Sequence, residues 1–199
     1  QTQGNVIASN DLNSIIDDPS ISVVIEVMGG IEPAKTFILN ALKNGKDVIT
    51  ANKALLATHG DEIFTEARKQ NRSVFFEASV AGGIPVIKAL REGLAGNQIS
   101  KISGILNGTC NYILSAMHKT PLSFAEALKN AQQLGYAEAD PTFDIEGLDT
   151  GHKLSILTSL AFGVPFHFDI TAVEGIKGIS SLDIRFAQQL GFVVKLLAT

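Results

Sequence analysis

The spacing of apolar residues in the first part of the chain predicts alternating strands and helices. Residues 21–27 (ISVVIEV) form a nearly continuous β-branched run, which is typical of a strand buried on both faces of a parallel sheet. After Pro33, residues 34–43 carry apolar side chains at helical spacing until Gly45 ends the helix. The same signals predict a short helix within 10–20, strands at 47–50 and 73–77, and helices at about 60–70 and 85–92. This alternation predicts a right-handed, parallel α/β layout.

The pattern changes after Gly93. Residues 98–106 alternate between apolar and polar side chains, as in a sheet with one open face. Further strands are predicted at 172–176 and 192–197, and helices from Asn107 or Thr109 onward, at 123–134, at about 147–162 and at about 182–190. We therefore predict an α/β plus α+β fold: the second half of a Rossmann-like sheet in residues 1–93, joined to an α+β domain in residues 94–199.

Composition narrows the class of protein. Net charge is −4, with 20 acidic and 16 basic residues spread along the chain, which gives no electrostatic footprint for DNA or RNA. One cysteine, Cys110, excludes an intramolecular disulfide framework and fits a reducing compartment. The first residues lack the layout of a signal peptide, and the apolar runs are too short for a membrane span. We expect a soluble, cytoplasmic protein.

The segment 135–153 (GYAEADPTFDIEGLDTGHK) concentrates negative charge. Its carboxylates are Glu138, Asp140, Asp144, Glu146 and Asp149. No lysine or arginine lies between Lys129 and Lys153, so no local cation neutralises them. The segment is suited to a cationic or zwitterionic small molecule. The alternative is that the acids are ordinary loop and turn residues; calcium is disfavoured because the spacing does not match an EF-hand loop.

Asp149 and Lys153 stand one helical turn apart. A generic pair at this spacing is a surface ion pair that contributes about 0.2–0.5 kcal/mol to the stability of the helix. Lys153, however, lies on the face continued by Ile156, Leu157 and Leu160, which must pack against a neighbour. A lysine held beside a carboxylate stays protonated until a reaction takes its proton, which suits a general acid.

Ligands of open α/β sheets lie beyond the carboxyl ends of the strands, here residues 28–30, 50–53 and 77–79. Lys53 is either a solvated loop residue or a cation directed at a ligand. Glu77 with the turn 80–84 either binds a cation or belongs to a tight turn permitted by the glycines at 82 and 83. The histidines have no partners at ligand or triad spacing, so we expect packing or capping for His152 and surface or structural roles for His59, His118 and His167.

Three motifs together closely resemble homoserine dehydrogenase: GILNGTCNYIL at 104–114, the acidic segment at 135–153, and TANKALLA at 50–57. The similarity covers almost all of the chain, and the long acidic block is its most distinctive part. The resemblance implies NAD(P)-dependent interconversion of aspartate semialdehyde and homoserine, on the route to threonine and methionine.

The resemblance also implies roles for individual residues. Lys153 matches the proposed proton donor of the family, and Asp144 and Asp149 match acids that hold or orient the substrate. Glu138 matches the glutamate that binds the homoserine amino group, and Lys53 matches a lysine lying between cofactor and substrate. We further expect Thr109 and Tyr136 to bind substrate and Gly29 to bind cofactor.

Two further properties follow from the same resemblance. A monovalent cation, sodium in some members, is implied at Glu77 and the backbone oxygens of Val80, Gly82 and Ile84. A homodimer is implied if the sheet of the second domain presents an open apolar face.

The chain departs from the family in one respect: no GxGxxG turn occurs in it. Its first residue is not methionine and its last residues lie in an apolar run, so we expect a piece cut at both ends that alone binds NAD(P) poorly or not at all. Two other readings stay open: a non-catalytic amino-acid-binding or dimerisation module, and a metal-dependent lyase or hydrolase. The sequence decides neither NAD against NADP nor whether a regulatory or kinase domain is attached.

Overall fold

The computed structural model describes residues 8–166 and 168–199, so the prediction for His167 lies outside the described residues. The chain folds as two compact units, of which the first ends at Lys88 and the second begins at Ala89. No helix in the described ranges is both long enough and apolar enough to cross a membrane.

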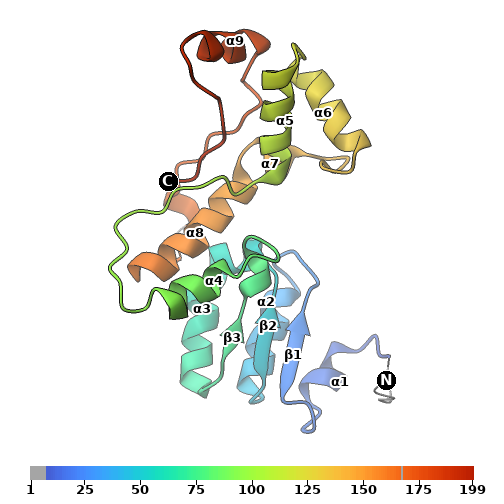
Figure 1. The fold of residues 1–199 in the computed structure, drawn as a ribbon. Coiled ribbons are helices and arrows are strands. Elements are labelled where there is room, and N and C mark those ends of the chain that lie inside the picture. Colours follow the sequence, from blue (N-terminus) through green and yellow to red (C-terminus); the bar gives the residue numbers. More distant parts are fainter. Residues whose placement is uncertain (1–7, 167) are drawn as a thin grey trace, which may run out of the picture. The chain divides into compact units, whose positions relative to one another are not determined.

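The first unit is built on a three-stranded parallel sheet in the order β1 (Val23–Glu26), β2 (Asp47–Thr50) and β3 (Val74–Phe75). Its register places Val24 beside Val48 and Val48 beside Val74. Helix α2 (Ala34–Lys43) packs against β1, β2 and α3 (Lys53–Gln70), and α1 (Leu12–Ile16) packs against α2 (Figure 1). The predicted parallel α/β layout is therefore confirmed.

The prediction that residues 21–27 are buried on both faces is wrong. Val24 and Glu26 are buried, but the alternate residue Ile25 is 67% exposed, as is 51% of Phe75 on the same face. Side chains alternate across a strand, so one face of the sheet packs against the helices and the other is open. The β-branched run thus predicted the strand correctly but did not predict whether one or both faces of the sheet are covered.

The boundaries of three elements also differ from the predictions. Helix α3 begins at Lys53 instead of near residue 60, because the Asn52 side chain accepts a hydrogen bond from Leu55 N and caps it. Strand β3 ends at Phe75, and Glu77 begins the short 3₁₀ turn η1 (Glu77–Ser79). The expected helix at 85–92 is a short α4 (Val86–Lys88) that continues into a π-helical turn, η2 (Ala89–Gly93).

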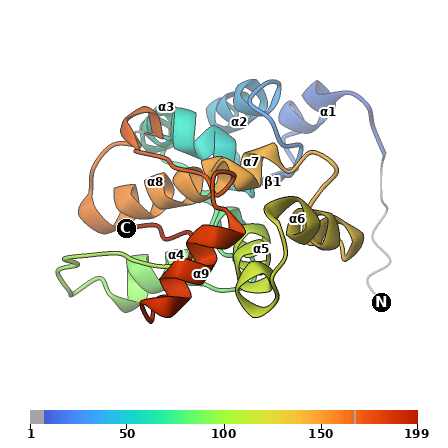
Figure 2. The same cartoon turned by 90° about the horizontal axis from the view of Figure 1, so that it is seen from above.

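The second unit is mainly helical. Its helices are α5 (Gly108–Lys119), α6 (Phe124–Gln133), α7 (Thr142–Ile145), α8 (Leu148–Phe162), the 3₁₀ turn η3 (Phe168–Ile170) and α9 (Ser181–Gln189). Helix α5 lies between α6 and α9 and contacts both (Figures 1 and 2). The core of this unit forms around α5, with Cys110, Ile113 and Leu114 packed against Ala127 and Ala131 of α6. The sequence places Ser123 three residues before Glu126, which is the spacing of a capping box, and this capping box begins α6.

The strands predicted at 98–106, 172–176 and 192–197 do not form ladders within the described residues. Gly104 and Ala198, at or beside two of these segments, make one isolated antiparallel bridge by exchanging N–H···O bonds of 3.0 and 2.9 Å. A strand requires consecutive pairs of this kind, and alternation of side chains along one segment does not supply the partner.

Candidate active site

The acidic segment is more ordered than a loop. Gly135, with φ of +77°, follows the end of α6, and the four-residue helix α7 interrupts the segment before Gly147 leads into α8. Sequence reasoning missed α7, whose start is marked by the Asp140 side chain accepting from Thr142 N at 3.1 Å. Hydrogen bonds from Thr142 lower the pKa of Asp140. Asp140 is therefore a turn-forming residue.

The segment between α7 and α8 is clamped by the extended chain at 173–176. Ile176 N donates to Ile145 O at 2.8 Å. A Cβ placed on Gly175 would lie 2.4 Å from Ile145 O and 2.6 Å from Glu146 Cα, so only glycine permits this approach. This packing fixes the backbone between Asp144 and Asp149.

Lys153 and Asp149 meet as the helical spacing predicted. Lys153 Nζ donates to Asp149 Oδ2 at 2.6 Å and to the backbone oxygen of Leu106 at 2.9 Å. Asp149 is only 4% exposed, and Lys153 is partly buried. An ion pair shielded in this way is not the solvated surface pair of the alternative reading, because water screens it little.

Asn107 joins this pair to Asp144. Its Nδ2 donates to Asp144 Oδ1 at 2.7 Å and to Asp149 Oδ2 at 2.9 Å, while its Oδ1 accepts from Cys110 N at 2.7 Å. The sequence indicated Asn107 only as a possible helix cap. Its contacts with residues 37 and 42 positions away follow from the fold and left no local signal.

Cys110 adds a structural contact beneath the same cluster. Burial raises the pKa of its thiol to about 12, and the charges of Asp144 and Asp149 act in the same direction. The thiol therefore stays protonated at neutral pH, and Sγ donates to the backbone oxygen of Asp144 at 3.2 Å. A thiol held in this state is a packing and hydrogen-bonding group and not a nucleophile.

Three further predicted site residues lie beside the start of α5 or in the turn after α6. The hydroxyl of buried Thr109 donates to the backbone oxygen of Tyr136 at 2.6 Å, and the rings of Tyr112 and Tyr136 lie 4.9 Å apart. Glu138 is exposed, and its backbone oxygen accepts from Gln132 Nε2 at 3.1 Å. The structure thus brings Thr109 and Tyr136 together and leaves the Glu138 carboxylate open to solvent.

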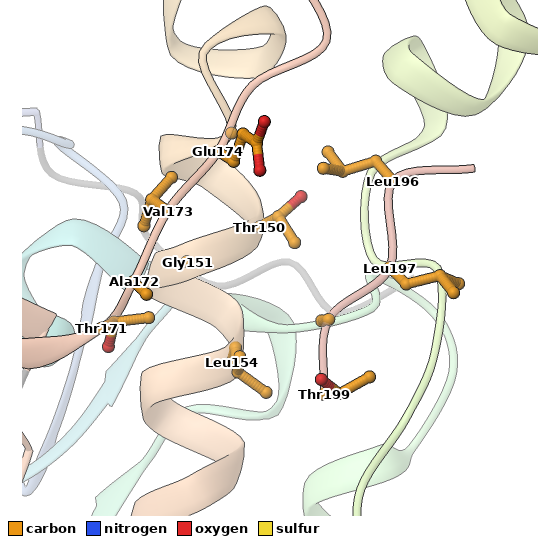
Figure 3. Close-up of a pocket in the computed structure, with 12 residues that line it drawn as sticks. Thr150, Gly151, Leu154, Thr171, Ala172, Val173, Glu174, Leu196, Leu197 and Thr199 are labelled. Atoms are coloured by element: carbon orange, nitrogen blue, oxygen red, sulfur yellow. The ribbon is translucent and has the colours of Figure 1, made fainter. Parts of the chain in front are cut away.

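His152 is a packing residue, as predicted. Its buried ring contacts Phe143 and Phe168 edge to face, with centroid distances of 5.2 and 4.1 Å. A cavity of about 230 Å³ in the same unit is lined by Thr150, Gly151 and Leu154 of α8, by residues 171–174 and by residues 196–199 (Figure 3). Asp149 and Lys153 are not among its lining residues, so the cavity is separate from the charged cluster.

In the first unit, a buried carboxylate shapes the turn after β1. Glu26, 1% exposed, accepts from the backbone N–H groups of Met28 and Gly29 through Oε1, at 2.6 and 3.3 Å, and from the Thr50 hydroxyl through Oε2 at 2.6 Å. Gly29 has φ of +74°, and no atom lies within 4 Å of the place of a Cβ. A left-handed glycine turn with open space is what close approach of a phosphate-bearing cofactor requires.

Asn52 ties that turn to α3. Its Nδ2 donates to the backbone oxygen of Gly30 at 2.7 Å, and its Oδ1 caps the helix at Leu55 N. Lys53 is consequently the first residue of α3 and not a loop residue. Gly29 and Lys53 therefore lie at one edge of the sheet, and neither Glu26 nor Asn52 was singled out from the sequence.

Glu77 closes the turn that follows β3. Its two carboxylate oxygens accept from Ile87 N and Lys88 N, each at 2.9 Å. Ala81 and Gly82 have φ of +62° and +57°, and Ile84 O accepts from Val86 N at 2.8 Å. In the part of the chain that the structure describes, no group of three or more His, Cys, Asp or Glu side chains is placed to hold a metal ion.

A parallel α/β unit with a glycine turn after its first strand is typical of nucleotide-binding domains, and a shielded ammonium–carboxylate pair is suited to general acid–base chemistry. Residues 2–77 match a family model described as homoserine dehydrogenase, NAD binding domain, and residues 85–199 match one described as homoserine dehydrogenase. The chain belongs to the homoserine dehydrogenase family.

Individual relatives agree. The homoserine dehydrogenase of Neisseria gonorrhoeae is 58% identical over 177 residues, which are 89% of this chain and 41% of that protein. The Pseudomonas aeruginosa enzyme is 53% identical over 93% of this chain and 43% of its own length. The chain thus spans about two-fifths of the length of these curated relatives.

Solved structures show the same fold. A homoserine dehydrogenase from Thiobacillus denitrificans superposes with a TM-score of 0.93 at 52% identity, covering 95% of this chain and 44% of that one. A hyperthermophilic archaeal homoserine dehydrogenase in complex with NADPH gives a TM-score of 0.77 at 29% identity, covering 87% of this chain and 53% of that one.

Proposed function

We propose that the polypeptide carrying this chain is an NAD(P)-dependent homoserine dehydrogenase that interconverts aspartate semialdehyde and homoserine. Membership of the family supplies the class of reaction. The observation that carries the proposal for this chain is the shielded contact between Lys153 and Asp149.

Lys153 acts as the proton donor. When hydride reaches the aldehyde carbon, the carbonyl oxygen becomes an alkoxide that needs a proton. An ammonium has three protons, and the contacts with Asp149 and Leu106 use two of them. The third can be given to the alkoxide. Asp149 fixes the ammonium by its 2.6 Å contact, so that the lysine need not be ordered during the reaction.

The charged ends of the substrate require opposite partners. Asp144 and the exposed Glu138 supply carboxylates for the substrate ammonium group. Thr109 and Tyr136 are proposed to line the substrate site, in keeping with their mutual hydrogen bond. Lys53 is proposed to serve the substrate carboxylate and the cofactor.

The nicotinamide cofactor supplies the hydride. The archaeal relative solved with NADPH supports a cofactor of this type. In this chain the open, left-handed turn at Gly29 and the adjacent Lys53 fit the approach of such a group. Glu26 and Asn52 hold that turn in shape by their hydrogen bonds.

A monovalent cation, sodium, is proposed at the turn closed by Glu77. One carboxylate and the backbone oxygens of Val80, Gly82 and Ile84 are oxygen donors of the type that hard cations take. A homodimer, a cytoplasmic location and a place in threonine and methionine biosynthesis complete the proposal. They rest on the family alone.

Steady-state kinetics test the proton donor. With the polypeptide expressed at its full natural length, homoserine-dependent reduction of NADP is expected to fall by about 10²- to 10⁴-fold in Lys153→Ala, the usual contribution of a general acid or base. Lys177→Ala is the matched control, because the Lys177 ammonium lies in an exposed contact of 3.3 Å with Glu146. Unchanged turnover in Lys153→Ala would exclude the role, and loss of activity on chelation would favour the metal-dependent reading instead.

A further inference from the structure

Asn107 lies where a neutral donor is required. Asp144 and Asp149 both direct an oxygen at its amide, and two carboxylates sharing one site repel each other unless a donor lies between them. An amide nitrogen has two protons, and these two hydrogen bonds use both of them. Asn107 is 4% exposed, so water cannot easily replace it.

The orientation of the amide is fixed from the other side. Cys110 N donates to Asn107 Oδ1 at 2.7 Å, so the oxygen must face the helix and the nitrogen must face the carboxylates. The first turn of α5 thereby sets the direction in which both protons point. A residue that turned freely could not set the spacing between the two acids.

Asn107 is linked to the proposed proton donor, Lys153, in two ways. Asp149 Oδ2 accepts from Asn107 Nδ2 and from Lys153 Nζ at the same oxygen. Lys153 Nζ donates in addition to the backbone oxygen of Leu106, the residue directly before Asn107. Any shift of Asn107 therefore moves both acceptors that hold the ammonium.

We infer that Asn107 is a positioning residue that locks Asp144 and the Asp149–Lys153 pair into one arrangement and keeps that arrangement free of additional negative charge. The inference rests on the proposed function for its catalytic consequence. The hydrogen-bond network itself does not depend on the identity of the substrate.

Two substitutions separate this role from helix capping. Serine and aspartate both cap helices about as well as asparagine. Asn107→Ser keeps the cap but has one proton where two are needed. Asn107→Asp keeps the cap but adds a negative charge beside Asp149. Ser123→Ala is the control, because it removes the cap of α6 and leaves Asn107 in place.

Activity is the first readout, measured in the full-length polypeptide. Asn107→Ser is expected to stay folded with a lowered unfolding midpoint, because a hydrogen bond to a buried carboxylate is lost, and to lose roughly ten- to a hundredfold in kcat/KM for homoserine. Asn107→Asp is expected to lose a similar factor and to move the pH dependence of kcat, since the added charge stabilises the ammonium form of Lys153. Ser123→Ala is expected to lower the midpoint and leave the pH profile unchanged.

A second readout does not require activity. In the chain labelled at lysine, NMR titration of the Lys153 side chain is expected to have its midpoint at higher pH in Asn107→Asp than in Asn107→Ser. Equal midpoints, together with kcat/KM of the serine variant within twofold of the wild type, would overturn the inference. A wild type without homoserine-dependent turnover would overturn the proposed function, and the titration would still decide the role of Asn107.

Discussion

Asn52 precedes α3 and Asn107 precedes α5. Their Oδ1 atoms make the same kind of hydrogen bond, whereas their Nδ2 atoms donate to different kinds of acceptor. Each Oδ1 accepts from a backbone N–H three residues further on, Leu55 N for Asn52 at 3.1 Å and Cys110 N for Asn107 at 2.7 Å. The Nδ2 of Asn52 donates to the neutral oxygen of Gly30. The Nδ2 of Asn107 donates to the two carboxylates described above.

This difference follows from the candidate site of each unit. In the first unit the candidate site is the backbone turn at Gly29, whose conformation a hydrogen bond between neutral groups preserves. In the second unit the candidate site is a cluster of charged side chains, which must be both positioned and neutralised. A hydrogen bond between neutral groups contributes about 0.5–1.5 kcal/mol, whereas one to a charged group contributes about 1.5–3 kcal/mol. The second site should therefore be the more sensitive of the two.

The largest effects are expected when each of the two asparagines, Asn107 and Asn52, is replaced separately by alanine. Asn107→Ala is expected to lower the free energy of local opening around α5 by about 2–4 kcal/mol, because the cap and the bonds to two carboxylates are lost. Asn52→Ala is expected to lower the free energy of local opening around α3 by about 1–2 kcal/mol, because a helix cap and one hydrogen bond between neutral groups are lost. Native-state hydrogen exchange at the Cys110 and Leu55 amides measures each separately. Equal losses at the two helices would remove the distinction between the sites.

A smaller effect is expected from the contact that clamps the acidic segment. Gly175→Ala would drive a methyl group into Ile145 O, so the free energy of unfolding of the second unit should fall by about 1–3 kcal/mol. Gly178→Ala is the matched control, since no atom lies within 4 Å of its Cβ position. Urea unfolding followed by tyrosine fluorescence reports this unit, because both tyrosines, Tyr112 and Tyr136, belong to it. If the two variants have the same free energy of unfolding, close packing at Gly175 does not hold the segment between α7 and α8.

The smallest expected effect depends on pH. The pKa of Cys110 is about 12 in the folded protein and 9.0 is its ordinary value, so the folded state keeps a proton that the unfolded state releases. The resulting stability is fully present below pH 9.0 and falls as pH rises toward 12. Between pH 8 and pH 9.5 the wild type should lose stability, by on the order of 1 kcal/mol, relative to Cys110→Ser, which cannot ionise in this range. A constant difference between the two proteins would show that the thiol is not held protonated.

Local signals predicted several elements of the fold correctly. The capping box at Ser123 and Glu126 and the pairing of Asp149 with Lys153 are set by spacings of three and four residues, so the sequence displays them directly. The start of α3 was missed: the helix was predicted from about residue 60, whereas Gly60 is a buried residue inside a helix that begins at Lys53. Glycine permits a break but does not require one.

Contacts between distant residues could not be predicted in the same way. Asn107 meets Asp144 and Asp149 only because α5 packs beside α7 and α7 beside α8. The exposed face of the sheet was likewise hidden, since a β-branched run looks the same whether one face is covered or both. The sequence therefore indicated the chemistry of the site through its residue types, and the fold supplied the residue that organises them.

The proposed proton donor is the ammonium group of Lys153. The most direct measurement replaces it with Lys153→Cys in the full-length polypeptide and then restores an ammonium by alkylating the new thiol with 2-bromoethylamine. Treated wild type is the control, because buried Cys110 should not react. We expect Lys153→Cys to lose roughly a hundredfold or more in homoserine-dependent turnover and to recover a substantial part of it after alkylation. A folded, fully alkylated protein as inactive as the untreated variant, or a cysteine variant as active as the wild type, would contradict the proposed role of Lys153.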